Sequence, residues 1–162
     1  MRKTIELSPI GQIKTPFKEK KDMPIQPTGA KGIKAEIEIY QEYTEGLKDL
    51  DGFSHIVLIY HFHQSEGFDL TVVPFMDDKP HGVLSTRAPR RPNPIGMSVV
   101  KLNKIEGNIL HIENIDVLDG TPILDIKPFI PDVDSPEVSK LGWLEGRSDK
   151  MADKQSDNRF NK

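Results

Sequence analysis

The chain has 162 residues, 36% of them hydrophobic and 29% charged, with a net charge of −3. This length suits one domain, and no apolar run approaches the roughly 20 residues of a membrane span. The absence of cysteine excludes disulfide frameworks, thiolate nucleophiles, zinc ribbons and iron–sulfur clusters. The N-terminus lacks the apolar core of a signal peptide, so we expect a cytoplasmic protein with no membrane partner.

Short strands dominate the predicted elements. Residues 33–39 alternate apolar and charged side chains, as in a half-buried strand. Residues 41–51 change to spacings of four and three, which predicts a short helix. Residues 54–62, SHIVLIYHF, have the β-branched and aromatic composition of a central strand. Further strands are predicted at 7–13, 70–74, 82–86, 95–102, 109–117 and 122–128, with turns at 106–108 and 119–120.

Many short strands with little helix predict an all-β fold, a small antiparallel β-barrel with one or two short helices. The 13 prolines fall between or at the ends of the predicted strands, and barrel closure would protect the strand edges. We expect one domain over residues 1–146 and a polar, disordered tail over 147–162, which has little to bury. Residues 16–31 are predicted to form a functional loop.

The most unusual segment is residues 82–100, GVLSTRAPRRPNPIGMSVV, in which Arg87, Arg90 and Arg91 are interleaved with prolines. Proline restricts its own φ and the preceding residue, so the three guanidiniums form a pre-organised cationic edge suited to a carboxylate or phosphate. Asn93 can bond polar groups and Gly96 permits close approach. The alternative is a solvated turn whose arginines pair with acidic side chains of neighbouring loops: Asp49, Asp51 or Asp77.

The stretch TRAPRRPNPIGMSVVKL, residues 86–102, resembles the signature of the TsaA-like, or TrmO, family of tRNA methyltransferases. Three further segments agree in the family's order: IGQIKTPFKEKKDMPIQP, LDGFSHIVLIYHFHQ and DVLDGTPILDIKPFIPDVD. The resemblance covers roughly residues 5–145. Ala88 departs from the pattern, where the family has Ser. Longer bacterial relatives continue into a second domain, so we expect this shorter form to bind tRNA more weakly, to use a partner, or to act on a somewhat different RNA.

The resemblance implies a β-barrel that dimerises, binds S-adenosyl-L-methionine, and methylates N6 of threonylcarbamoyladenosine next to the anticodon of a tRNA substrate. By similarity, the predicted cofactor contacts are Pro27, Thr28, Gly29, His63, Gln64, Arg87, Met97, Glu113, Asn114, Ile115 and Asp116. The chain also lacks the strand–Gly-x-Gly–helix opening of the doubly wound nucleotide-binding folds, so such a cofactor must be held by other means.

Methyl transfer from a sulfonium needs alignment of donor and acceptor more than covalent help from the protein. The amide-like acceptor nitrogen is weakly nucleophilic, so cations that stabilise the developing anion would speed attack. Arg87, Arg90, Arg91 and Asn93 are the predicted catalytic residues, and the arginines would also fork the threonyl carboxylate. The general base stays open between Asp116 and His63.

Two rival functions are considered. His61 and His63 form an HxH pair whose rings share one face of a strand, as in cupin-like metal enzymes, but packing of the histidines is the simpler interpretation and we expect no metal. A non-enzymatic RNA-binding barrel would use the arginines as a phosphate clamp, yet exposed aromatics for base stacking are few in the sequence. The Asp119–Gly120 turn is expected to support the arginine segment, with Asp119 or Asp125 orienting an arginine.

Overall fold

The computed structural model describes residues 3–20, 23–25, 27–155 and 157. Six antiparallel strands close into a barrel, which confirms the predicted β-rich class. Around the barrel the strands are β1 (Gly11–Lys14), β2 (Lys34–Ile39), β7 (Ile109–Glu113), β6 (Ile95–Glu106), β3 (His55–His61) and β8 (Pro122–Pro128). Closure pairs β1 with both β2 and β8, so every strand of this sheet has two neighbours.

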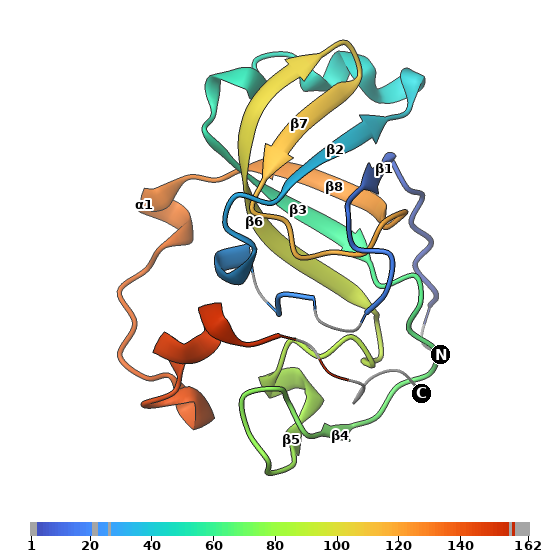
Figure 1. Ribbon diagram of the computed structural model, residues 1–162. Helices are drawn as coiled ribbons and strands as arrows, with labels where there is room; N and C mark the ends of the chain where they lie inside the picture. Colours follow the sequence, from blue (N-terminus) through green and yellow to red (C-terminus); the bar gives the residue numbers. More distant parts are fainter. Residues whose placement is uncertain (1–2, 21–22, 26, 156, 158–162) are drawn as a thin grey trace.

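A second sheet of two short strands, β4 (Thr71–Val72) and β5 (His81–Gly82), lies below the barrel in Figure 1. The other elements are single helical turns or little more: η1 (Pro27–Ala30), η2 (Gln41–Leu47), η3 (Leu50–Gly52), η4 (Val83–Ser85), α1 (Pro131–Asp134), η5 (Gly142–Leu144) and η6 (Ser148–Asp153). Among the residues described, none of the helices is long and apolar enough to cross a membrane.

The barrel core follows from the period-two alternation of the strands. Alternate residues of β3, Ile56, Leu58 and Tyr60, point inward and are buried. On the neighbouring β6, the first two inward positions are Gly96 and Ser98, and larger aliphatic residues follow. Burying an Ile or Leu side chain contributes about 1.5–3 kcal/mol, so the aliphatic layers hold the barrel while its Gly96 end tolerates polar groups.

Two predicted strands are much shorter than expected. Only Gly82 of residues 82–86 is in a strand, because Thr86 donates from both its amide (3.1 Å) and its hydroxyl (2.8 Å) to the carbonyl of Val83 and closes the turn η4. Of residues 70–74, only Thr71 and Val72 pair, since Pro74 has no N–H with which to extend a ladder.

Other boundaries shift for local reasons. The strand predicted over 7–13 begins only at Gly11. The side chain of Leu7 is 60% exposed and does not pack into the barrel core. The strand predicted over 109–117 ends at Glu113, because Asn114 has a left-handed φ of 66°. The strand predicted over 95–102 instead runs to Glu106 past a bulge. The helix predicted over 41–51 is split into η2 and η3.

The predicted boundary between the barrel domain (1–146) and a disordered tail (147–162) stays a prediction. Within the described part of that tail, η6 spans Ser148–Asp153 and packs against η1, and Gln155 forms an isolated bridge with Pro24. Residues 156 and 158–162 lie outside the described part of the chain. In Figure 1 the red C-terminal segment runs beneath the barrel, beside the green segment that carries β4 and β5.

Candidate active site

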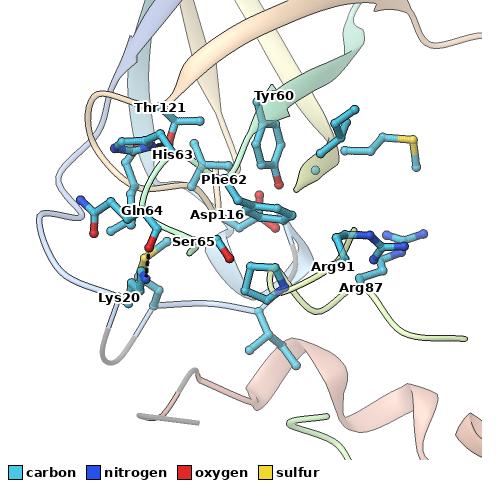
Figure 2. A pocket seen from close by; sticks show the side chains of 18 of the residues that line it. Lys20, Tyr60, Phe62, His63, Gln64, Ser65, Arg87, Arg91, Asp116 and Thr121 are labelled. Atoms are coloured by element: carbon cyan, nitrogen blue, oxygen red, sulfur yellow. Dashed lines mark hydrogen bonds between the residues drawn. The ribbon is translucent and has the colours of Figure 1, made fainter. Parts of the chain in front are cut away.

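A cavity of about 330 Å³ opens at the end of the barrel where β3 ends and β6 begins. Figure 2 shows its walls, with Tyr60, Phe62 and His63 from the end of β3 on one side and Arg87 and Arg91 on the other. The chain that follows β7 contributes Asp116 and Thr121, and the predicted loop contributes Lys20 and residues 23–25. Residues from four segments that lie far apart in the sequence therefore meet in this cavity.

A chain of three side chains lies in this wall. Ser98, buried in the barrel mouth, donates to Asp116 Oδ1 at 2.6 Å and bonds the Tyr60 hydroxyl at 3.0 Å. Burial raises the pKa of Asp116 to about 6, against the opposing effects of the Ser98 hydrogen bond and of Arg87. Burial also raises the pKa of Tyr60, helped by Asp116. The cavity thus holds a carboxyl group that changes charge only slightly below neutral pH.

Because Gly96 has no side chain, it leaves room for the hydrogen-bonded Tyr60 ring. It pairs with Tyr60 across the β3–β6 ladder, and a Cβ built on Gly96 would overlap the Tyr60 ring, including Cζ at 2.6 Å, and meet Phe62 Cζ at 2.8 Å. Tyr60 and Phe62 meet edge to face with centroids 5.5 Å apart. The aromatic wall can therefore lie against β6 only where that strand lacks a side chain.

We expect Gly96→Ala to destabilise the protein by about 1–3 kcal/mol, the usual cost of overpacking, and to weaken ligand binding in the cavity by displacing Tyr60. Gly46→Ala is the matched control, because a Cβ at Gly46 meets nothing within 4 Å. Denaturant unfolding measures both variants. Equal stability of the two would show that the Tyr60 ring is not confined as the geometry indicates.

Two further basic groups, Lys20 and His63, line the cavity away from Arg87 and Arg91 (Figure 2). The Lys20 ammonium donates to the carbonyl of Gln64 at 2.7 Å, which ties the N-terminal loop to the end of β3. Burial, followed by repulsion from Arg90, lowers the pKa of Lys20. Burial, followed by repulsion from His61 and Lys20, lowers the pKa of His63. His63 is consequently neutral at physiological pH, and its Nδ1 lies 3.5 Å from the Thr121 hydroxyl.

The three arginines have different surroundings. Arg90 Nε donates to Asp69 Oδ2 at 2.9 Å, so its acidic partner is on a loop that the sequence did not single out. Arg91 Nη1 donates to the carbonyl of Thr86 at 3.0 Å and braces the segment, while its side chain still lines the cavity. Arg87 lines the cavity and exerts an electrostatic effect on Asp116.

A second, larger cavity of about 1170 Å³ adjoins the first. Arg87, Pro89 and Met97 line both, so they form the wall between the two. The C-terminal segment closes its far side with Trp143, Leu144, Ser148 and Asp149. A ligand in the smaller cavity and one in the larger cavity would meet at this shared wall.

The C-terminal segment is anchored beside the larger cavity. Trp143 stacks on His81 with centroids 4.7 Å apart, and its indole N–H donates to the carbonyl of Ser85 at 2.8 Å. Arg147 bonds Asp77 at 2.6 Å, and Asp77 also bonds His81 at 2.9 Å. The His81 hydrogen bond is the main reason why the pKa of Asp77 is lowered.

Comparisons with known proteins identify the family to which the chain belongs. The family profile of the tRNA-methyltransferase O N-terminal domain matches residues 12–135. The chain belongs to the TrmO family. A "probable S-adenosyl-L-methionine-binding protein" of Pyrococcus abyssi is 53% identical over 94% of this chain and 83% of its own length.

Two further relatives extend the comparison. The crystal structure of TrmO from Pseudomonas aeruginosa superposes with a TM-score of 0.73 at 38% identity, covering 87% of this chain. The tRNA (adenine(37)-N6)-methyltransferase of Mus musculus is 36% identical over 80% of this chain. The chain spans 63% of the Pseudomonas TrmO structure and 32% of the mouse protein. The predicted family is therefore confirmed, for a domain shared with longer proteins.

The cavity brings together some of the residues to which the TrmO resemblance assigned roles and not others. Its lining includes His63, Gln64, Arg87, Arg91, Met97 and Asp116. Gly29 is exposed in η1, outside the lining of either cavity among the described residues, and the side chains of Pro27 and Thr28 lie outside what is described. Asn93 is exposed, and its carbonyl accepts from the Ile95 amide at 2.7 Å.

The four residues 113–116 have different surroundings, and only some of them line a cavity. Glu113 faces away from the barrel and bonds Asn103 at 3.1 Å, with Lys101 at 3.7 Å. Asn114 accepts from the Gly32 amide at 2.9 Å, a bond that fixes its left-handed turn, and it lines the larger cavity. Ile115 is fully buried in the core. Asp116 alone of the four reaches the smaller cavity.

The residues that sequence reasoning missed are Tyr60 and Ser98. Tyr60 and Ser98 occupy inward strand positions, where a polar atom in an apolar alternation was the available signal. The expected support from Asp119 and Asp125 takes another form: Asp119 accepts from the Thr15 amide at 2.9 Å and from Lys18, and Asp125 pairs with Lys127 at 2.8 Å.

Ala88, where the TrmO pattern has Ser, is buried in a small cluster with Val72 and Val83. An apolar side chain suits that position, so the departure leaves the arginine segment intact. Within the described residues, His61 and His63 belong to no group of three or more His, Cys, Asp or Glu side chains placed to hold a metal ion.

Proposed function

We propose that this chain is an S-adenosyl-L-methionine-dependent tRNA methyltransferase whose cofactor occupies the smaller cavity. The observation that carries the proposal is that one mostly apolar cavity is lined both by the Asp116 carboxyl and, on the facing segment, by Arg87, whose charge acts on that carboxyl. S-adenosylmethionine has cationic and anionic groups on a partly apolar frame, which matches that lining. The names of the relatives from Pyrococcus and mouse agree with this assignment.

When bound, S-adenosylmethionine supplies an electrophilic methyl group, which an acceptor nitrogen takes while the carbon–sulfur electron pair returns to sulfur. The protein's part in such a displacement is to align the two ligands and to exclude water. Tyr60, Phe62 and Met97 provide apolar walls, and Arg91 stiffens the arginine segment through its bond to Thr86.

We further propose N6 of threonylcarbamoyladenosine, next to the anticodon, as the acceptor, and the larger cavity as its site. That cavity adjoins the cofactor cavity at Arg87 and Met97, where the methyl group must pass from one ligand to the other. A guanidinium in the shared wall suits the carboxylate of a threonylcarbamoyl group, which it can bind with two parallel hydrogen bonds.

A homodimer and a cytoplasmic location remain part of the proposal. Leu84 and Met97 in the wall of the larger cavity are 79% and 47% exposed, and exposed apolar groups beside a binding site favour a partner surface. We expect that partner to be a second copy of this chain, as the family resemblance implies. The cytoplasm is where a tRNA substrate would be met.

Transfer of a radiolabelled methyl group from S-adenosylmethionine to two matched tRNAs tests the proposed reaction. One tRNA carries threonylcarbamoyladenosine and the other is the same transcript without the modification. We expect label in the first and background in the second. Label in both would contradict the proposed acceptor, and tRNA binding without any transfer would favour the rival RNA-binding barrel.

A further inference from the structure

The directions of the hydrogen bonds around Ser98 depend on the charge of Asp116. An ionised carboxylate only accepts, so Ser98 must donate its single hydroxyl proton to Asp116 Oδ1, at 2.6 Å. Ser98 can then bond Tyr60 only as an acceptor, so the Tyr60 hydroxyl donates, at 3.0 Å. Both Tyr60 and Ser98 are buried. With Asp116 ionised, the hydrogen bonds therefore run Tyr60→Ser98→Asp116, and every hydroxyl proton is in use.

We propose that Ser98 and Tyr60 are positioning residues for the cofactor: their hydrogen-bond chain keeps Asp116 ionised and oriented as the anionic contact for a cationic group of S-adenosylmethionine. This inference rests on the proposed function. It assigns roles to two residues that would otherwise be taken for core filling. Ser98 has no other apparent reason to interrupt the apolar inward face of β6, which continues with Val100 and Leu102.

Opposing effects act on Asp116. Burial raises its pKa to about 6, whereas the Ser98 hydrogen bond and the charge of Arg87 lower it. Removing the hydroxyl of Ser98 would leave burial less opposed, so the carboxyl would be protonated at a higher pH. Among the residues that the structure describes, the titratable and charged groups around it in the cavity are Tyr60 from β3, His63 after β3, Lys20 from the N-terminal loop, Arg87 and Arg91 from the arginine segment, and Asp157.

The test is the pH dependence of S-adenosylmethionine affinity between about pH 5 and pH 8, measured calorimetrically for Ser98→Ala and Tyr60→Phe. Each variant is measured with His63 in place and again with His63→Gln, because protonation of His63 would also repel a cation. In both backgrounds we expect affinity to fall as the pH drops through about 6, where Asp116 takes up a proton. Ser98→Ala should move that midpoint upward by about one pH unit or more, with affinity largely recovered at the alkaline end.

Tyr60→Phe should move the midpoint in the same direction by less, because Ser98 still donates to Asp116. The Tyr60→Phe variant also tests the inference if Ser98→Ala folds poorly. A loss of affinity by the same factor at every pH would mark the two residues as merely structural and overturn the inference. If the unmodified chain binds and the midpoints of the Ser98→Ala and Tyr60→Phe variants coincide with its own, only this inference fails. If the unmodified chain does not bind at any pH, the proposed function fails with it.

Discussion

Asp116→Asn is expected to make the protein more stable above about pH 6 while abolishing measurable S-adenosylmethionine binding. The Asp116 carboxyl has a pKa of about 6 in the fold and an ordinary value of 3.8. A carboxyl whose pKa is raised by folding contributes stability that is fully present below pH 3.8 and is lost as the pH rises through about 6. Asparagine resembles the neutral form at every pH and can still accept from Ser98, so the variant avoids this loss.

The expected gain is about 3 kcal/mol, from about 1.4 kcal/mol for each pH unit between the two pKa values. This corresponds to a rise of about 6–12 °C in Tm for a chain of this size. Thermal unfolding near pH 8 and near pH 3 provides the measurement, and the gain should disappear at the lower pH. A variant that is less stable at both pH values would show that Asp116 supports the fold instead of being held at a cost for ligand binding.

Arg87→Ala is expected to lower kcat/KM for methyl transfer to modified tRNA by about 10²-fold or more, the usual cost of losing one charged donor that acts where charge develops. Arg87 lines the wall shared by the two cavities, so its loss affects both ligands.

Arg90→Ala is the matched control, since it removes the same charge three residues away. Arg90 bonds Asp69, which is 54% exposed, and its loss should change kcat/KM by less than about fivefold. Steady-state rates of the two variants decide the matter. Similar losses in both would mean that the segment acts through its total positive charge and not through Arg87 at the shared wall.

The barrel was predictable from the sequence because its determinants are local. Alternation in residues 33–39 and the β-branched run in 54–62 each specify a strand with a defined inward face. Where the prediction was wrong, a few hydrogen bonds determine the local structure. Two hydrogen bonds from Thr86 to the carbonyl of Val83 form η4 where a strand was predicted, and the hydrogen bond from the Gly32 amide to Asn114 accompanies the turn that ends β7. Such contacts join or close segments in ways that periodicity does not record.

The site was predictable where it depends on an unusual segment, and unpredictable where it depends on packing. The arginine segment pointed to Arg87 and Arg91, both of which line the cavity. Sequence could not tell them from Arg90, because the Asp69 side chain that pairs with Arg90 comes from a loop 21 residues away. Tyr60 and Ser98 were missed because their inward positions on β3 and β6 suggested core residues, and only barrel closure brings them to Asp116.

The most direct test of the cofactor assignment is calorimetric titration of the intact chain with S-adenosylmethionine, alongside Glu113→Gln. Glu113 is a cofactor contact by resemblance, yet its carboxylate bonds Asn103 on the outer face of the barrel. We predict about one cofactor per chain at micromolar affinity, close to −8 kcal/mol, for both proteins. Absence of binding by the folded chain would contradict the assignment, and loss of binding in Glu113→Gln would place the cofactor outside the cavity of Asp116.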